Sequence, residues 1–221
     1  MMTCKKTIIT ITTLLFFILN MIVNTQAQAV QGLDDDYLQP FSGYSKMDPK
    51  VIKREADRNF FLYFGTKDKL KKERYINSAL KGYYILSQIT PSDIDIYIKL
   101  GKIYDEKNIS ELAKTNFYKA LNISKDATMA NFYFGDYYYK RNDYKKALYH
   151  YKIAYKNGVL RTYDFNLRLA TIYEKLADLS NAKKFYEISY NMKADPKIGE
   201  KIHSLNELNY DKSDYYHNIR E

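Results

Sequence analysis

Cysteine is almost absent from this sequence, in which Cys4 is the only example among 221 residues. Residues 1–29 have the layout of a secretory signal peptide, so the chain that remains after cleavage would contain no cysteine. This excludes disulfides, thiol chemistry and cysteine-based metal sites from the mature protein. Its stability must therefore come from packing alone.

Histidine and glycine are also scarce, with three and eight residues in the whole chain. His150, His203 and His217 lie far apart, and none belongs to an HExxH motif. The sequence contains no glycine-rich phosphate loop and no nucleophile elbow. We therefore predict that the protein is not an enzyme and holds no cofactor and no metal ion. We expect His150 to lie on the surface of a helix.

The N-terminal segment has three parts that together indicate export. Lys5 and Lys6 form a positive region, residues 7–23 are apolar, and Ala27 and Ala29 are small residues at the −3 and −1 positions. We predict cleavage after Ala29 and a periplasmic or secreted protein. An uncleaved membrane anchor is the alternative, although four threonines and Asn20 dilute the apolar stretch.

The formal net charge is +9, but Lys and Arg are interleaved with Asp and Glu along the chain. Such interleaving is typical of solvated helix faces, and export argues against a nucleic-acid partner. Attraction to an anionic envelope surface is the alternative interpretation. The absence of Trp beside 24 Tyr, together with many Lys, Asn and Ile residues, is typical of AT-rich coding and indicates a bacterial origin.

A pattern of large and small residues returns after 34 positions between residues 97 and 189. The three copies are Tyr97, Leu100, Gly101, Tyr104, Ala113, Phe117 and Ala120; then Asn131, Phe134, Gly135, Tyr138, Ala147, Tyr151 and Ala154; then, after one inserted residue, Asn166, Leu169, Ala170, Tyr173, Ala182, Tyr186 and Ser189. This pattern resembles the tetratricopeptide repeat. The resemblance implies an all-α fold, a right-handed α-solenoid of helix–turn–helix repeats that usually holds another polypeptide.

The repeat pattern also predicts the organisation of the chain. We expect a repeat domain over residues 47–209, in which the full repeats are 94–127, 128–161 and 163–196, preceded by a degenerate repeat at about 60–93 and followed by a capping helix at 197–209. Residues 30–46 contain Gly32, Pro40 and Gly43 and are expected to form an extended or disordered lead. Residues 210–221 are expected to be a flexible tail.

Capping residues predict where the helices begin and end. Asp48-Pro49 should start a helix that stops at Gly65, and a second helix should begin within 68–74 and end at about 88. In the first full repeat we expect helices over about 93–106 and 109–122, with Asn108 as the cap of the second.

Two further expectations concern the full repeats. In the second repeat, Asn142 or Asp143 should cap the second helix. Small Gly101 and Ala113 should lie where the two helices of the first repeat cross, because larger side chains would push their axes apart.

The resemblance further implies a concave surface formed by the first helix of each repeat. Its groove positions are Asp95, Ile98, Lys102, Asp105 and Glu106 in the first full repeat; Met129, Phe132, Asp136, Tyr139 and Lys140 in the second; and Asp164, Leu167, Thr171, Glu174 and Lys175 in the third. Such spacing places each set along one stripe of its helix. Some apolar members, Phe132 and Leu167 in particular, can equally belong to the core.

The carboxylate clamp known from this family requires residues that the chain lacks at most positions. Ile98 and Lys102 stand where Lys and Asn are needed, and only Arg168, which we also assign to the groove, matches. The mixed groove would suit an amphipathic helix or an extended segment with apolar anchors. The sequence thus predicts an exported scaffold for protein or peptide partners. The alternative is an envelope structural or assembly factor that contacts anionic lipid or wall polymer through a basic surface.

Overall fold

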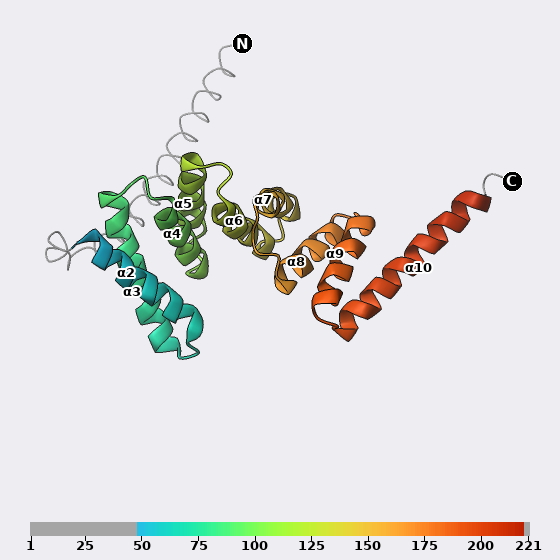
Figure 1. Cartoon of the computed structure of the whole chain (residues 1–221), viewed down its shortest axis with the longest axis horizontal. Coiled ribbons are helices and arrows are strands. Elements are labelled where there is room, and N and C mark those ends of the chain that lie inside the picture. The colour runs from blue at the N-terminus through green and yellow to red at the C-terminus, as the bar shows by residue number, and fades with distance from the viewer. Residues whose placement is uncertain (1–47, 219–221) are drawn as a thin grey trace, which may run out of the picture. The chain divides into compact units, whose positions relative to one another are not determined.

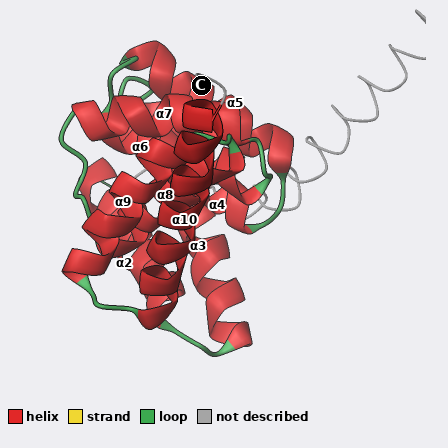
Figure 2. Ribbon diagram, turned by 90° about the vertical axis from the view of Figure 1, so that its right-hand side faces the viewer, coloured by secondary structure: helices red, strands yellow, loops and turns green. Residues whose placement is uncertain are grey.

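The computed structural model describes residues 48–218, with side chains up to residue 207. Helices and connecting loops make up this range, in which no strand occurs (Figures 1 and 2). The helices are α2 (Pro49–Gly65), α3 (Lys69–Ile89), α4 (Ile94–Glu106), α5 (Ser110–Ile123), α6 (Thr128–Lys140), α7 (Tyr144–Lys156), α8 (Tyr163–Lys175), α9 (Leu179–Met192) and α10 (Pro196–Asn218). The predicted all-α class is confirmed, whereas the predicted signal peptide and lead lie outside the described residues.

The chain divides into two compact units within α3, between Ile85 and Leu86. In the first unit, α2 begins after Asp48, whose side chain accepts a hydrogen bond from the amide of Lys50, and it ends at Gly65 as predicted. Helix α3 begins one residue after Asp68, which accepts a hydrogen bond from the Lys71 amide at 3.1 Å. Both helices of this hairpin therefore begin at an aspartate cap.

The second unit contains three helical hairpins, α4–α5, α6–α7 and α8–α9, followed by α10. Helices α4 and α5 match the predicted bounds to within one residue. The aromatic residue near the middle of each second helix packs on the first helix of the next repeat: the ring centroids of Phe117 and Phe134 are 5.1 Å apart, and those of Tyr151 and Phe165 are 5.2 Å apart. One continuous apolar core thus joins consecutive repeats.

Glycine lies where the helices of the first two full repeats come closest. A Cβ atom on Gly101 would lie 2.8 Å from the Phe117 ring, and one on Gly135 would lie 2.4 Å from the Tyr151 ring. Both distances are shorter than carbon atoms tolerate, so the small residue is needed for the close approach. The predicted role of Gly101 at the crossing is confirmed.

The turn inside each full repeat has the same backbone geometry. Its middle residue lies in the left-handed region, with φ of 59° at Asn108 and Asn142 and 60° at Ala177. The amide after it donates to a carbonyl five residues earlier, as in the 2.8 Å bond from Ile109 to Tyr104. This is the arrangement of a Schellman motif, which ends the first helix of the repeat.

One capping prediction is wrong for a reason that this turn explains. Asn108 does not cap α5, because its backbone is the left-handed residue that ends α4. The N-cap position falls on Ile109, which has no side-chain oxygen and makes no capping bond. In the next repeat Asn142 takes the left-handed position, and Asp143 caps α7 by accepting a hydrogen bond from the Lys146 amide at 3.2 Å.

Helix α10 is longer than the predicted cap. It begins at Pro196, after Asp195, and continues beyond Asn209 to Asn218, so most of the predicted flexible tail is helical. No proline or glycine follows Gly199, so nothing in the sequence stops the helix at the predicted boundary. Among the described helices, none has a stretch long and apolar enough to cross a membrane.

Candidate functional site

The predicted groove residues of the second unit do not form one open surface. Four of them are buried, namely Ile98, Lys102, Asp105 and Asp136, which are between 4 and 9% exposed. Their expected place on an open groove is corrected, since side chains from neighbouring helices cover them. Cations from the following repeat cover Asp105. A tyrosine from the same repeat and an arginine from the following repeat cover Asp136.

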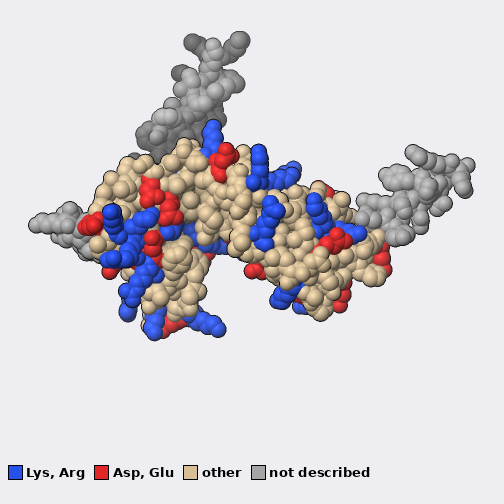
Figure 3. Space-filling model, in the orientation of Figure 1, with Lys and Arg blue, Asp and Glu red and all other residues tan. Residues whose placement is uncertain are grey.

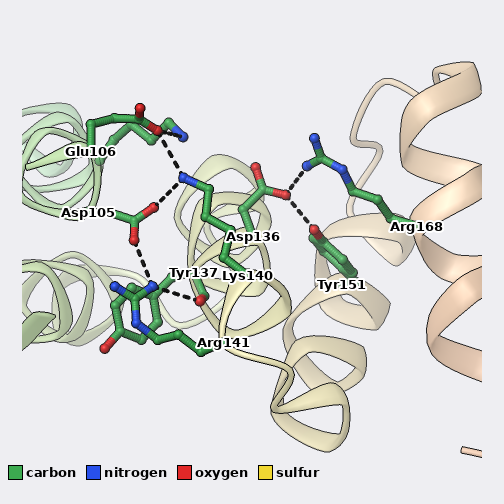
Figure 4. Close-up of polar contacts among 9 residues, drawn as sticks. Asp105, Glu106, Asp136, Tyr137, Lys140, Arg141, Tyr151 and Arg168 are labelled. Carbon is green, nitrogen blue, oxygen red and sulfur yellow. Dashed lines mark hydrogen bonds and ion pairs between the residues drawn. The ribbon is translucent and has the colours of Figure 1, made fainter. Parts of the chain in front are cut away.

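Asp105 lies near the end of α4 and holds two cations from the end of α6 (Figure 4). Lys140 donates to its Oδ2 at 2.8 Å, and Arg141 donates to its Oδ1 at 2.8 Å. Lys140 also bonds Glu106 at 2.9 Å. Burial alone would raise the pKa of Glu106, but Lys102 and Lys140 lower that pKa to about 2. The acidic end of α4 is thereby neutralised by the following repeat.

Asp136 on α6 makes the next connection. Its Oδ1 accepts hydrogen bonds from the Tyr151 hydroxyl on α7 and from the Arg168 guanidinium on α8 (Figure 4). Burial and the nearby carboxylate raise the pKa of Tyr151, so the hydroxyl remains a donor. Burial opposes the charge of Arg168, but Asp136 and Tyr151 raise the pKa of its guanidinium. The three groups form a charge-assisted network that joins two repeats.

Glu174 on α8 makes a third connection, to α10. Lys201 bonds its Oε1 at 2.6 Å, and the Tyr186 hydroxyl donates to its Oε2 at 2.6 Å. Burial alone would raise the pKa of Glu174, whereas Lys201 and Tyr186 lower it. Ion pairs therefore run from α4 through α6 and α8 to α10, along the stripe that the sequence assigned to partner binding.

Sequence reasoning missed the partners in these connections, which are Arg141, Tyr151, Tyr186 and Lys201. The sequence does contain a signal for the charged partner Arg141. It lies about one repeat after Asp105, as Lys140 does, so opposite charges recur at the spacing of the repeat. No such signal marks the tyrosines, since an aromatic residue at their position is required by packing in any case.

Some of the predicted groove residues line a hollow of about 430 Å³. Its lining residues are Tyr139, Asp164, Leu167, Arg168, Thr171, Tyr186, Lys197, Ile198 and Lys201. The first five were predicted groove residues, so the structure brings together members of the second and third repeats. The last three lie on α10, which the sequence analysis treated only as a cap.

The chemistry of this hollow is mixed. Leu167 is half-buried, and with Tyr139 and Ile198 it supplies apolar surface. Among the residues that the structure describes, neither Asp164 nor Lys197 takes part in an ion pair, and both are exposed. The hollow can therefore receive an apolar side chain and offer one free charge of each sign to its neighbours.

The other predicted residues lie outside this hollow. Phe132 is half-buried and packs edge-on against Phe165, with ring centroids 5.6 Å apart, so it belongs to the margin of the core. Met129 is 44% exposed, and Asp95 pairs with Lys99 at 2.9 Å on the same helix. A second, polar hollow of about 470 Å³ is lined by Asp105, Glu106, Asn108, Lys140 and Arg141.

His150 is buried rather than on a helix surface, which corrects the expectation from the sequence. Its Nδ1 lies 3.0 Å from Oδ1 of Asn131, and its ring stacks on Tyr138 with a centroid distance of 5.7 Å. Burial lowers the pKa of His150 to about 4. In the described part of the chain, no three His, Cys, Asp or Glu residues are grouped so that they could hold a metal ion.

Neither a protein-family model nor a curated protein matches the sequence. Among solved structures, PilF of Pseudomonas aeruginosa has 17% identity and a TM-score of 0.56, over 75% of this chain and 72% of that one. MamA has 18% identity and a TM-score of 0.52, over 65% and 86% of the two chains. YrrB, described as "a TPR protein with an unusual peptide-binding site", has 21% identity and a TM-score of 0.54, over 61% and 70%. These similarities show that the chain has the tetratricopeptide repeat fold, as the 34-residue pattern predicted.

Proposed function

We propose that this tetratricopeptide-fold protein is a non-catalytic scaffold that binds a segment of another polypeptide in the hollow between α8 and α10. The observation that carries the proposal is the hollow itself, where five residues predicted for the groove meet three residues of α10. Its volume accommodates one or two side chains of a peptide rather than a small folded domain. The peptide-binding site named for YrrB supports the same use of the fold.

The lining residues indicate what the bound segment contains. Leu167, Tyr139 and Ile198 favour an apolar anchor residue, because burial of apolar surface provides most of the binding energy in such sites. Lys197 is an exposed cation beside this surface, so an acidic residue next to the anchor would find an opposite charge. The bound segment is therefore short and has an apolar anchor, with a carboxylate on the side that faces Lys197 and a cation or a neutral residue on the side that faces Asp164.

Selection of peptides from a random displayed library on the full chain tests this function. The selected peptides should lose about tenfold or more in affinity when Leu167→Glu or Tyr139→Ala is introduced. Tyr149→Ala is the matched control, because Tyr149 is 62% exposed but does not line the hollow. Peptides that bind all variants equally, or a selection that yields none, would show that the hollow is not the binding site.

We also propose that the scaffold acts after export. The supporting observations are those of the sequence: Lys5 and Lys6, the apolar residues 7–23 and the small residues Ala27 and Ala29. Sequencing the N-terminus of the protein from its own cells should find Val30 as the first residue. A protein that begins at Met1 or Met2 and stays with the membrane would instead support the uncleaved anchor.

A further inference from the structure

The turn between α2 and α3 differs from the turns inside the three full repeats. Leu70 is 79% exposed and Phe61 is 68% exposed, although both are large apolar residues. Both lie within about one helical turn of the loop that joins the helices. Single exposed apolar residues are common on proteins, but here two lie at the end of one hairpin.

Lysines flank Leu70 in the sequence of this turn. Lys67, Lys69 and Lys71 are all exposed, and none is in an ion pair with another described residue. The acidic groups nearby are Asp68, whose carboxylate caps α3, and the exposed Glu73. Figure 3 shows Lys and Arg side chains, with acidic side chains between them, at the end of this hairpin. The end of the hairpin thus combines apolar side chains with an excess of positive charge.

From this combination we infer that the α2–α3 turn is a contact site for the surface of an anionic phospholipid membrane. Leu70 and Phe61 enter the boundary between headgroups and acyl chains, while the lysine ammonium groups bind lipid phosphates. The turn is the closed end of a hairpin, and a convex end of this kind suits a flat surface better than a peptide that needs an enclosing groove. A soluble polyanion would pair with the lysines but would leave Leu70 in water.

This inference places the sequence's alternative hypothesis, an interaction with an anionic surface, at one turn of the first unit. It is independent of the proposed hollow, which lies in the second unit and involves none of these residues. A protein with both sites would hold its polypeptide partner while attached to a membrane. Failure of either site leaves the other proposal unaffected.

An environment-sensitive fluorophore at the turn tests the inference. The full chain carries Cys4→Ser and Leu70→Cys, so that the label is attached at one position. The control carries the label at Leu160→Cys, because Leu160 is also 79% exposed but lies in the α7–α8 connection. The probe membranes are vesicles of phosphatidylglycerol with phosphatidylcholine, and vesicles of phosphatidylcholine alone. Circular dichroism checks that each labelled chain keeps its helix content.

With the anionic vesicles, the label at residue 70 should shift its emission to that of an apolar environment and be quenched by spin-labelled lipid. Raising the salt from about 0.05 M to about 0.5 M should reverse the change. Joint replacement of Lys67, Lys69 and Lys71 by serine should weaken the response about tenfold or more. The inference is overturned by no response at residue 70, by an equal response at residue 160, or by an equal response with neutral vesicles.

Discussion

The second and third full repeats place different residues in the same packing arrangement. In the second, the ring of His150 stacks on Tyr138 with an interplanar angle of 4°; in the third, Phe185 stacks on Tyr173 at 11°. The histidine also contacts Oδ1 of Asn131, whereas Oδ1 of Asn166, the corresponding residue in the third repeat, is buried with no hydrogen-bond partner in the described structure. The repeat pattern thus determines where a ring lies, but the identity of that ring determines whether a buried amide is satisfied.

The same two repeats also have different residues at the helix crossing and in the turn. Gly135 stands at the crossing of the second repeat, whereas Ala170 occupies that position in the third and is fully buried. At the left-handed position of the turn, Asn142 in the second repeat corresponds to Ala177 in the third. The two copies therefore have equivalent backbones, but equivalent positions contribute differently to the free energy of unfolding. Exchanging residues between the copies measures these differences.

The largest effect is expected at the helix crossing. Gly135→Ala introduces the third repeat's residue, but its Cβ would lie 2.4 Å from the Tyr151 ring. Because Tyr151 is fully buried and bonded to Asp136, the ring cannot move away freely, and the free energy of unfolding should fall by about 3 kcal/mol. Urea denaturation followed by circular dichroism measures this loss. Gly65→Ala is the control and should have little effect, since a Cβ there meets nothing within 4 Å.

A smaller loss is expected when the link between these repeats is removed. Asp136→Asn leaves the partly buried Arg168 without its opposite charge and should lower the free energy of unfolding by about 2 kcal/mol. Asp164→Asn removes a carboxylate that is exposed and outside any described ion pair, and it should change stability little. Both variants are measured by the same urea denaturation. Equal losses in the free energy of unfolding would show that the buried ion pair of Asp136 contributes no more to stability than an exposed carboxylate does.

The histidine makes the second repeat sensitive to pH. The folded protein keeps His150 neutral down to about pH 4, while an unfolded chain protonates it near pH 6.5. The free energy of unfolding should therefore decrease as the pH falls from about 6.5 to about 4, by up to about 1.4 kcal/mol per pH unit from this group.

The exchange His150→Phe, which copies the third repeat, isolates that contribution. It should remove this part of the pH dependence and, at neutral pH, cost about 1 kcal/mol because Oδ1 of Asn131 loses its partner. His203→Gln is the control, since His203 is an exposed residue. Identical slopes of stability against pH in the wild-type chain and in His150→Phe would contradict the assignment.

The smallest effect is expected at the turn of the third repeat. Ala177 has a φ of 60°, which an alanine adopts at a cost and glycine adopts freely. Ala177→Gly should raise the free energy of unfolding by about 0.5 kcal/mol or slightly more. The same change at Ala127, which has a negative φ, should instead be neutral or destabilising. A loss of stability at both positions in thermal denaturation would rule out strain in the turn.

Much of this fold could be predicted from the sequence because its determinants are local and repeated. The 34-residue pattern places Gly101 and Gly135 opposite large aromatic residues, and Asp48, Asp143 and Asp195 mark helix starts through bonds to nearby amides. Such contacts depend on residues within one turn or one repeat, so the order of residues alone determines them.

Only the tertiary structure decided which groove residues are available to a partner. Asp105 and Asp136 occupy positions that the sequence assigns to the groove, yet cations from the following repeat neutralise them. The burial of His150 and the hollow beside Leu167 likewise depend on how α7 packs on α6 and how α10 closes on α8. These outcomes follow from side-chain directions and from the angle between successive helices, and neither quantity is contained in the spacing of the repeat.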